Sequence, residues 1–159
     1  MKFHRYFGAI ITVLLLLSLS SCEDNMTPDN EVEYLEAGFM GMCFWGFYDK
    51  GYEEVVLTDM DSYLAFGDSV RVHIDNLDCS AATLPDIDFN KYFLVGKFTS
   101  GGGCSVEYDR QVTADEENNK LIYKIDADYT GLCSMLIVDM NWVLIPKKYC
   151  NYTIEFQVE

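Results

Sequence analysis

Histidine is almost absent from this chain, which has two in 159 residues, at His4 and His73. Nucleophilic catalysis of the Ser-His-Asp or Cys-His kind needs a histidine beside the nucleophile. The sequence also has no G-x-S-x-G motif and no C-x-x-C pair, and an isolated histidine in "VRVHID" is typical of a strand or loop residue. We therefore expect no enzymatic activity, no cofactor and no metal site.

Basic residues are scarce as well. The chain has 11 Lys and Arg against 26 Asp and Glu, a formal net charge of −15, and no basic run. Such a charge repels nucleic acid and anionic lipid headgroups, so we expect no nucleic-acid partner. The acids are spread along the chain, which is typical of a solvated surface.

A hydrophobic run long enough to span a membrane is the third absence. The apolar run from Phe7 to Leu19 has 13 residues, against the roughly 20 that a transmembrane helix needs. A basic start and the small residues before Cys22 are typical of a bacterial signal peptide. The stretch Leu19-Ser20-Ser21-Cys22 resembles a lipobox, which implies that residues 1–21 are a lipoprotein signal peptide and that Cys22 is lipidated. A chance cysteine after a conventional cleavage site is the alternative.

The residues after Cys22 predict the location of the protein. Residues 22–31 are polar and contain a proline, so they indicate a lipidated flexible tether. Glu23 and Asp24 resemble the surface-export signal of Bacteroidota lipoproteins, which implies an outer-membrane lipoprotein exposed at the cell surface; a periplasm-facing lipoprotein is the alternative. Residues 1–21 hold two of the basic residues and none of the acidic ones, so their removal changes the formal charge to −17.

Residues 32–159 have the length of a single domain, and their patterns indicate β-strands. Alternating apolar and polar residues predict strands at 104–113, 120–129 and 150–159, and apolar residues dominate 91–98 and 134–146. Thr58 with Asp61 three residues later predicts the start of one short helix. We expect a mainly all-β fold, an antiparallel β-sandwich or a partly open barrel with one short helix.

With Cys22 lipidated, five cysteines remain, so at most two disulfides can form. The short turns between 104–113, 120–129 and 133–144 predict an up-down-up meander. It would place Cys104 and Cys133 at the same end, beside loops that can bend over the strand end, and we expect them to be bonded. Cys43, Cys79 and Cys150 then compete for one further bridge.

Two segments are candidates for binding. The first is a glycine-rich loop that would allow close approach to another surface, with a plain hairpin loop as the alternative. The second is an aromatic segment, with a core strand as the alternative. The candidate residues are Thr99, Ser100, Gly101, Gly102 and Gly103 in the first and Phe44, Trp45, Phe47 and Tyr48 in the second.

Three pairs of acids stand two residues apart, at Asp59/Asp61, Asp86/Asp88 and Asp126/Asp128. On a strand this spacing puts both carboxylates on one face, as calcium binding or glycoside hydrolysis would require. The EF-hand pattern is missing, so we favour a solvated face.

The stretches "EEVVLTDMDSYLAF", "LPDIDFNKYFLVGKF", "GGGCSVEYDRQV", "WVLIPK" and "YTIEFQV" together resemble the C-terminal domain of the PrcB family. Its members are lipoprotein subunits of a bacterial surface protease complex. The resemblance spans Glu53 to Val158 and implies a non-catalytic β-sandwich that supports or binds a protein partner.

The function that we predict is a lipid-anchored, non-catalytic binding or scaffolding module of the cell envelope. Its partner would be an envelope protein, such as a surface protease. The alternative is a glycan-binding surface lipoprotein that stacks exposed aromatic rings on sugars. Only Trp45 and Trp142 are available for this, and Trp142 belongs to a strand that we expect to be buried.

Overall fold

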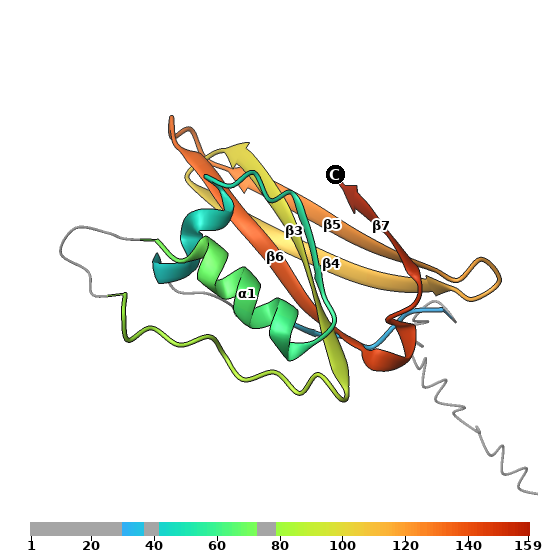
Figure 1. Ribbon diagram of the computed structural model, residues 1–159. Helices are drawn as coiled ribbons and strands as arrows, with labels where there is room; N and C mark the ends of the chain where they lie inside the picture. The colour runs from blue at the N-terminus through green and yellow to red at the C-terminus, as the bar shows by residue number, and fades with distance from the viewer. Residues whose placement is uncertain (1–29, 37–41, 73–78) are drawn as a thin grey trace, which may run out of the picture.

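The computed structural model describes residues 30–36, 42–72 and 79–159, and its strands form two separate sheets (Figure 1). In chain order the elements, with η for 3-10 helices, are β1 (Leu35–Glu36), η1 (Met42–Phe47), β2 (Glu54–Leu57), α1 (Met60–Val70), β3 (Tyr92–Gly102), β4 (Ser105–Asp115), β5 (Lys120–Thr130), β6 (Leu136–Pro146), η2 (Lys147–Tyr149) and β7 (Thr153–Val158). The fold is mainly β with one α-helix, and the sandwich is the architecture that it adopts.

The larger sheet has four strands in the order β1-β6-β3-β2, all antiparallel. The pair β3 and β6 runs its full length in register, from Tyr92 opposite Pro146 to Gly102 opposite Leu136. Four consecutive residues of β6, Met140 to Val143, are buried. Strand β6 is thus covered on both faces, as its nearly continuous apolar sequence predicts.

The smaller sheet has the order β4-β5-β7 and corrects two expectations. Strands β4 and β5 form the expected antiparallel hairpin, but β6 leaves β5 to join the other sheet, so the predicted meander is wrong. Strand β7 pairs with β5 in parallel, so the sheet is mixed rather than antiparallel. A turn as short as the one after β5 fits a change of sheet as well as a hairpin, which is why the pattern did not reveal the crossing.

The space between the sheets holds one of two hydrophobic clusters. The expected alternation along β5 is confirmed, with Leu121, Tyr123 and Ile125 buried. They pack with residues of the other strands, which are Phe93, Val95, Val112, Ala114, Val143 and Ile145. Burial on alternate positions of both sheets identifies the faces that pack together.

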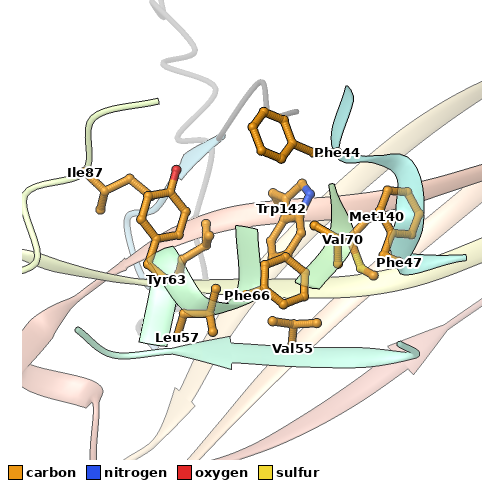
Figure 2. Packing of buried hydrophobic residues seen from close by; sticks show 11 residues of the cluster. Phe44, Phe47, Val55, Leu57, Tyr63, Phe66, Val70, Ile87, Met140 and Trp142 are labelled. Atoms are coloured by element: carbon orange, nitrogen blue, oxygen red, sulfur yellow. The ribbon is translucent and has the colours of Figure 1, made fainter. Parts of the chain in front are cut away.

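The second cluster lies on the other face of the larger sheet, beneath α1 and η1 (Figure 2). Trp142 of β6 is at its centre, with its ring 5.7 Å from that of Phe66 on α1. Phe44 and Phe47 of η1 are also buried there. The domain therefore has three layers, with the four-stranded sheet in the middle.

Helix α1 begins one residue later than the capping pattern predicts and ends further along the chain. Asp59, not Thr58, is the N-cap, and its Oδ1 accepts a hydrogen bond from the Ser62 N–H at 2.8 Å. This bond lowers the pKa of the Asp59 carboxyl. The helix continues to Val70, where we expected a loop from Gly67 on. Buried Phe66, Gly67 and Val70 explain the extension, because packing against the sheet outweighs the low helix propensity of glycine.

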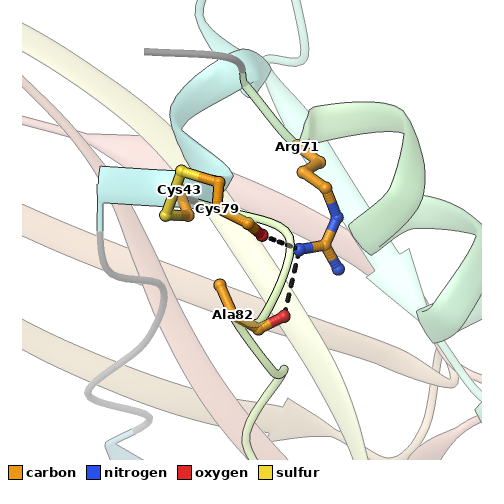
Figure 3. The surroundings of a disulfide bond; sticks show 4 residues. All are labelled: Cys43, Arg71, Cys79 and Ala82. Carbon is orange, nitrogen blue, oxygen red and sulfur yellow. Dashed lines mark hydrogen bonds between the residues drawn. A yellow bond between two sulfur atoms is a disulfide. The ribbon is translucent and has the colours of Figure 1, made fainter. Parts of the chain in front are cut away.

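A disulfide fastens this helical layer at Cys43 and Cys79, whose Cα atoms are 5.4 Å apart (Figure 3). The Arg71 guanidinium donates hydrogen bonds to the Cys79 carbonyl at 2.7 Å and to the Ala82 carbonyl at 3.0 Å. Cys150 is the remaining cysteine of the described residues and is free. Within the described ranges, no helix has the length and apolarity to cross a membrane.

Candidate functional site

At one end of the sandwich, two neighbouring segments lack charged side chains. Strand β3 ends there, β4 begins, β5 ends and β6 begins, so the segments 98–106 and 129–138 lie together. Neither segment contains an Asp, Glu, Lys or Arg, although charged residues make up 23% of the chain. Charges are usually distributed over a solvated surface, so this end is set apart by its composition.

Covalent and backbone bonds hold this end together. Cys104 and Cys133 form a disulfide with Cα atoms 4.9 Å apart, which confirms the predicted pairing. The Cys104 N–H donates to the Thr130 carbonyl at 2.6 Å, and the Gly103 N–H donates to the Met135 carbonyl at 3.1 Å. The connection between β5 and β6 is therefore bonded at both of its ends to the turn between β3 and β4.

Three large apolar side chains project from this connection. Leu132 is fully exposed, Met135 is 56% exposed and Leu136 is 64% exposed. We call Leu132, Met135 and Leu136 the apolar tip. Single exposed apolar residues are common, but three of them in a fastened, charge-free segment form a surface that can bury apolar area against a partner.

The glycine-rich segment is a strand end rather than a loop. Thr99 to Gly102 continue β3 and pair with β6, which corrects the expected flexible loop. Only Ser100 and Gly102 of the five predicted contact residues are exposed. A side chain at position 101 would collide with the Tyr129 ring, since a Cβ there would lie 2.5 Å from it. Glycine is thus needed for the close approach of the second sheet, and a role in contact stays a prediction for Ser100 and Gly102.

Two alanine substitutions distinguish the glycine that is needed for packing from the glycine that is exposed. We expect Gly101→Ala to lower the free energy of unfolding by about 1–3 kcal/mol, because the added methyl forces the Tyr129 ring away. The matched variant Gly102→Ala has open space around the new Cβ, whose nearest neighbour is 3.9 Å away. It is expected to be neutral, or more stable by up to about 0.5–1 kcal/mol, since alanine restricts the unfolded chain. Urea unfolding of both variants measures the difference, and equal stabilities would contradict the proposed contact.

Thr99 belongs to a buried polar network beneath the tip. The Asn141 side chain donates to the Thr99 hydroxyl at 2.9 Å and accepts from Arg110 Nε and Nη2 at 3.0 and 2.8 Å. Arg110 Nη1 also pairs with Glu36 Oε1 at 3.1 Å. Asn141 is 1% exposed, so these bonds satisfy groups that have no access to water. The Thr99 hydroxyl therefore joins the two sheets and is not a surface contact.

Burial also raises the pKa of two acidic groups near this network. It raises the pKa of Tyr108, whose hydroxyl lies 3.1 Å from that of Thr99, to about 12. It also raises the pKa of Asp139, while the Met140 N–H and then Arg110 act in the opposite direction. Tyr108 therefore keeps its proton at neutral pH and remains a hydrogen-bonding group between the sheets.

The aromatic segment forms η1, which is kinked at Phe44, and the turn after it, rather than a core strand. Phe44 and Phe47 are buried in the cluster around Trp142, so they are core residues and not contact residues. Trp45 is 47% exposed and Tyr48 is 52% exposed. The Tyr48 ring lies 5.9 Å from that of Phe98 on β3. Half of the predicted aromatic contact set is thus accessible at the surface.

Four carboxylates line the outer face of the smaller sheet behind the tip. Asp109 lies directly opposite Asp126, and Glu107 directly opposite Asp128, and all four are exposed. We call Glu107, Asp109, Asp126 and Asp128 the acidic ladder. Like charges in directly opposed positions repel each other, and Lys124, 3.4 Å from Asp126, offsets part of this. Within the described ranges, no group of three or more His, Cys, Asp or Glu side chains could hold a metal ion.

In each of the other two pairs, one acid serves the local structure. Asp59 caps α1, as described above. Asp88 accepts a hydrogen bond from the Asn90 N–H at 3.1 Å and pairs with Lys91 at 3.0 Å. The predicted lipidation site Cys22, the signal peptide, most of the tether and His73 lie outside the described residues.

Sequence reasoning missed the apolar tip itself. Met135 and Leu136 look like the start of a buried strand, because they continue into the apolar run of β6, and Leu132 lies in the turn before that run. The available signal was the absence of charge in two segments that the predicted disulfide joins.

Comparisons with known protein families, with curated proteins and with solved structures find no match for this chain. The PrcB-like resemblance therefore remains a prediction from the sequence motifs.

Proposed function

We propose that this chain is a non-catalytic binding module of the bacterial cell envelope. Lipid on Cys22 anchors it in the outer membrane, facing the cell exterior, and the apolar tip contacts an envelope protein. The observation that carries the proposal is the exposure of Leu132, Met135 and Leu136 in a charge-free segment fastened by a disulfide. A rigid apolar surface loses little conformational entropy when it binds, so its burial contributes directly to affinity.

The anchor is supported by the lipobox-like stretch before Cys22. Two or three acyl chains, at about 0.8 kcal/mol per buried CH₂, give stable attachment to a membrane. We expect Cys22→Ala to leave the chain unlipidated and uncut at this site. Detergent phase partitioning and intact mass measure this change, and a variant that partitions and is processed like the wild type would refute the lipid anchor.

The binding role predicts an effect at the tip that a matched substitution elsewhere does not have. We expect Leu132→Ser to remove a partner that co-purifies with the wild-type protein from detergent-solubilised envelopes. Leu64→Ser makes the same change at a half-exposed leucine of α1, away from the tip, and is expected to retain the partner. Recovery of the same proteins with the wild type and both variants would contradict a role of the tip in binding.

A surface protease is the first candidate partner, on the grounds of the PrcB-like motifs. A non-catalytic subunit of this kind would change the amount or the location of its protease rather than cleave substrate. Mass spectrometry of the partner recovered above tests this assignment directly.

Glycan binding is the second candidate, because Trp45 and Tyr48 are half-exposed while Trp142 is buried. Exposed aromatic rings can stack on the apolar faces of sugars. A glycan array with a hit that Trp45→Ala abolishes and Leu132→Ser leaves intact would favour this candidate over the first.

A further inference from the structure

We infer that the partner's binding surface is an apolar pocket flanked by basic side chains, and that Leu132 is the residue that enters this pocket. The inference rests on the proposed binding function and adds the chemistry of the partner. It follows from the apolar tip, from the acidic ladder beside it and from the position of both in the domain.

Leu132 has the properties of an anchor residue. Its side chain is fully exposed, and the backbone on both sides is held by the disulfide at Cys133 and by the Cys104 N–H to Thr130 carbonyl bond. Burying a whole leucine side chain that is exposed in the free protein contributes directly to affinity. Because the backbone is already fixed, little ordering cost offsets this gain.

The surroundings of Leu132 match the centre of an interface. Met135 and Leu136 add apolar area, and the segments 98–106 and 129–138 bring no charge that binding would have to desolvate. The centres of protein interfaces are depleted in charged residues in the same way.

The acidic ladder indicates which charge the partner carries around its pocket. Glu107 and Asp128 lie two residues from the Ser105–Thr130 pair at the base of the tip, a distance of about 7 Å along the strands. Asp109 and Asp126 continue the ladder away from the tip. A surface that covers Leu132 therefore comes close to these carboxylates, which attract a flank with Lys or Arg side chains and repel an acidic one.

The same charges argue against two other occupants. A second copy of this chain would bring two acidic ladders together at a shared tip. A bilayer would place lipid phosphates beside Glu107 and Asp128, which repel them. The tip also lies at the end of the sandwich opposite the first described residues, since Glu31 bridges to Thr113 near the far end of β4 (Figure 1). A protein partner with a basic rim is the occupant that fits.

Photo-crosslinking of the lipidated full chain in its native cells tests the inference. The photoreactive residue p-benzoylphenylalanine replaces Ser134, an exposed residue of the same connection, so that Leu132 is kept. Mass spectrometry identifies the crosslinked peptide. We expect one protein, crosslinked at an apolar pocket that has Lys or Arg residues at its rim. Adding Glu107→Lys and Asp128→Lys should lower the crosslink yield about tenfold. The matched pair Glu116→Lys and Glu117→Lys makes the same charge change in the turn between β4 and β5, at the other end of the hairpin, and should leave the yield within about twofold.

The outcomes separate the inference from the proposed function. A protein crosslink that the Glu107→Lys/Asp128→Lys pair leaves unchanged, or a rim without basic residues, overturns the inference while the binding function stands. Crosslinking to phospholipid or to a second copy of this chain overturns the inference as well. If position 134 captures nothing while the chain is folded and lipidated, both the inference and the role of the tip fail.

Discussion

Replacing Trp142 with alanine is expected to lower the free energy of unfolding by about 3–5 kcal/mol, the usual range for a buried tryptophan. The Trp142 side chain is 4% exposed and lies between the four-stranded sheet and α1 (Figure 2). Its ring occupies the space beside Gly96 on β3, where an added Cβ would lie 2.4 Å from it. Removing the ring leaves a cavity that neither the sheet nor the helix can close, because each is held by its own hydrogen bonds. Urea unfolding followed by far-ultraviolet circular dichroism measures the loss.

Trp45→Ala is the matched control for this prediction. It removes the same side chain from η1, where that side chain is 47% exposed and packs on one side against Phe47, with ring centroids 6.3 Å apart. Since about half of its area stays in water in the folded state, its loss is expected to cost no more than about half as much. Equal losses for the two variants would contradict the central position of Trp142.

The positions and faces of the long strands were predictable because they depend on local pattern. Side chains alternate across a strand, so the spacing of Leu121, Tyr123 and Ile125 identifies a buried face without knowledge of the partner strand. The same holds for β6, since Met140 to Val143 are all apolar or, at Asn141, satisfied by Arg110 and Thr99. The buried face of a strand can thus be predicted from the sequence of that strand alone.

Pairing between strands was not predictable in the same way. Strand β6 joins β3 of the other sheet, and β7 runs parallel to β5, although both follow short connections. Which sheet a strand joins depends on the apolar faces that the other strands offer, and on helix α1 covering one of them. These are properties of the whole domain rather than of any turn.

In the candidate site, too, the features that depend on contacts between elements were not predictable from local pattern. Glycines 101 and 102 read as a loop because glycine is depleted in strands. The reason for Gly101 is the Tyr129 ring of the other sheet, which no pattern around position 101 reveals. Likewise, Phe44 and Phe47 are buried while Trp45 and Tyr48 are exposed. The backbone path distinguishes them, because η1 is kinked at Phe44 and ends at Phe47, and Tyr48 follows in a turn.

The disulfide between Cys104 and Cys133 was predicted correctly from an incorrect topology. The meander would have put these residues at the ends of strands in one sheet. In the structure Cys104 precedes β4 of the three-stranded sheet, while Cys133 lies between β5 and β6, where the chain crosses to the four-stranded sheet. The pairing was nevertheless accessible, because both cysteines border the same end of the sandwich in either topology.

Removing this disulfide is the second large change that we expect. In the variant Cys104→Ser/Cys133→Ser, a loop closed across 29 residues becomes open in the unfolded state. The chain-entropy model gives a loss of about 3–4 kcal/mol in the free energy of unfolding for a loop of this length. The backbone bonds from Cys104 to Thr130 and from Gly103 to Met135 remain, so the variant is expected to fold but to hold Leu132 less rigidly. Urea unfolding measures the stability, and hydrogen exchange of residues 131–136 measures the rigidity of the tip.

The second disulfide supplies the control that separates stability from binding. Cys43→Ser/Cys79→Ser opens a loop across 36 residues in the helical layer, so its entropic cost is nearly the same. That bridge does not touch the tip, so the control variant should lose similar stability and keep its partner. The Cys104→Ser/Cys133→Ser variant should bind more weakly, because the partner must then order Leu132, Met135 and Leu136 on binding. If both variants bind the partner equally well at a temperature where both are folded, the disulfide stabilises the domain but does not prepare the tip for recognition.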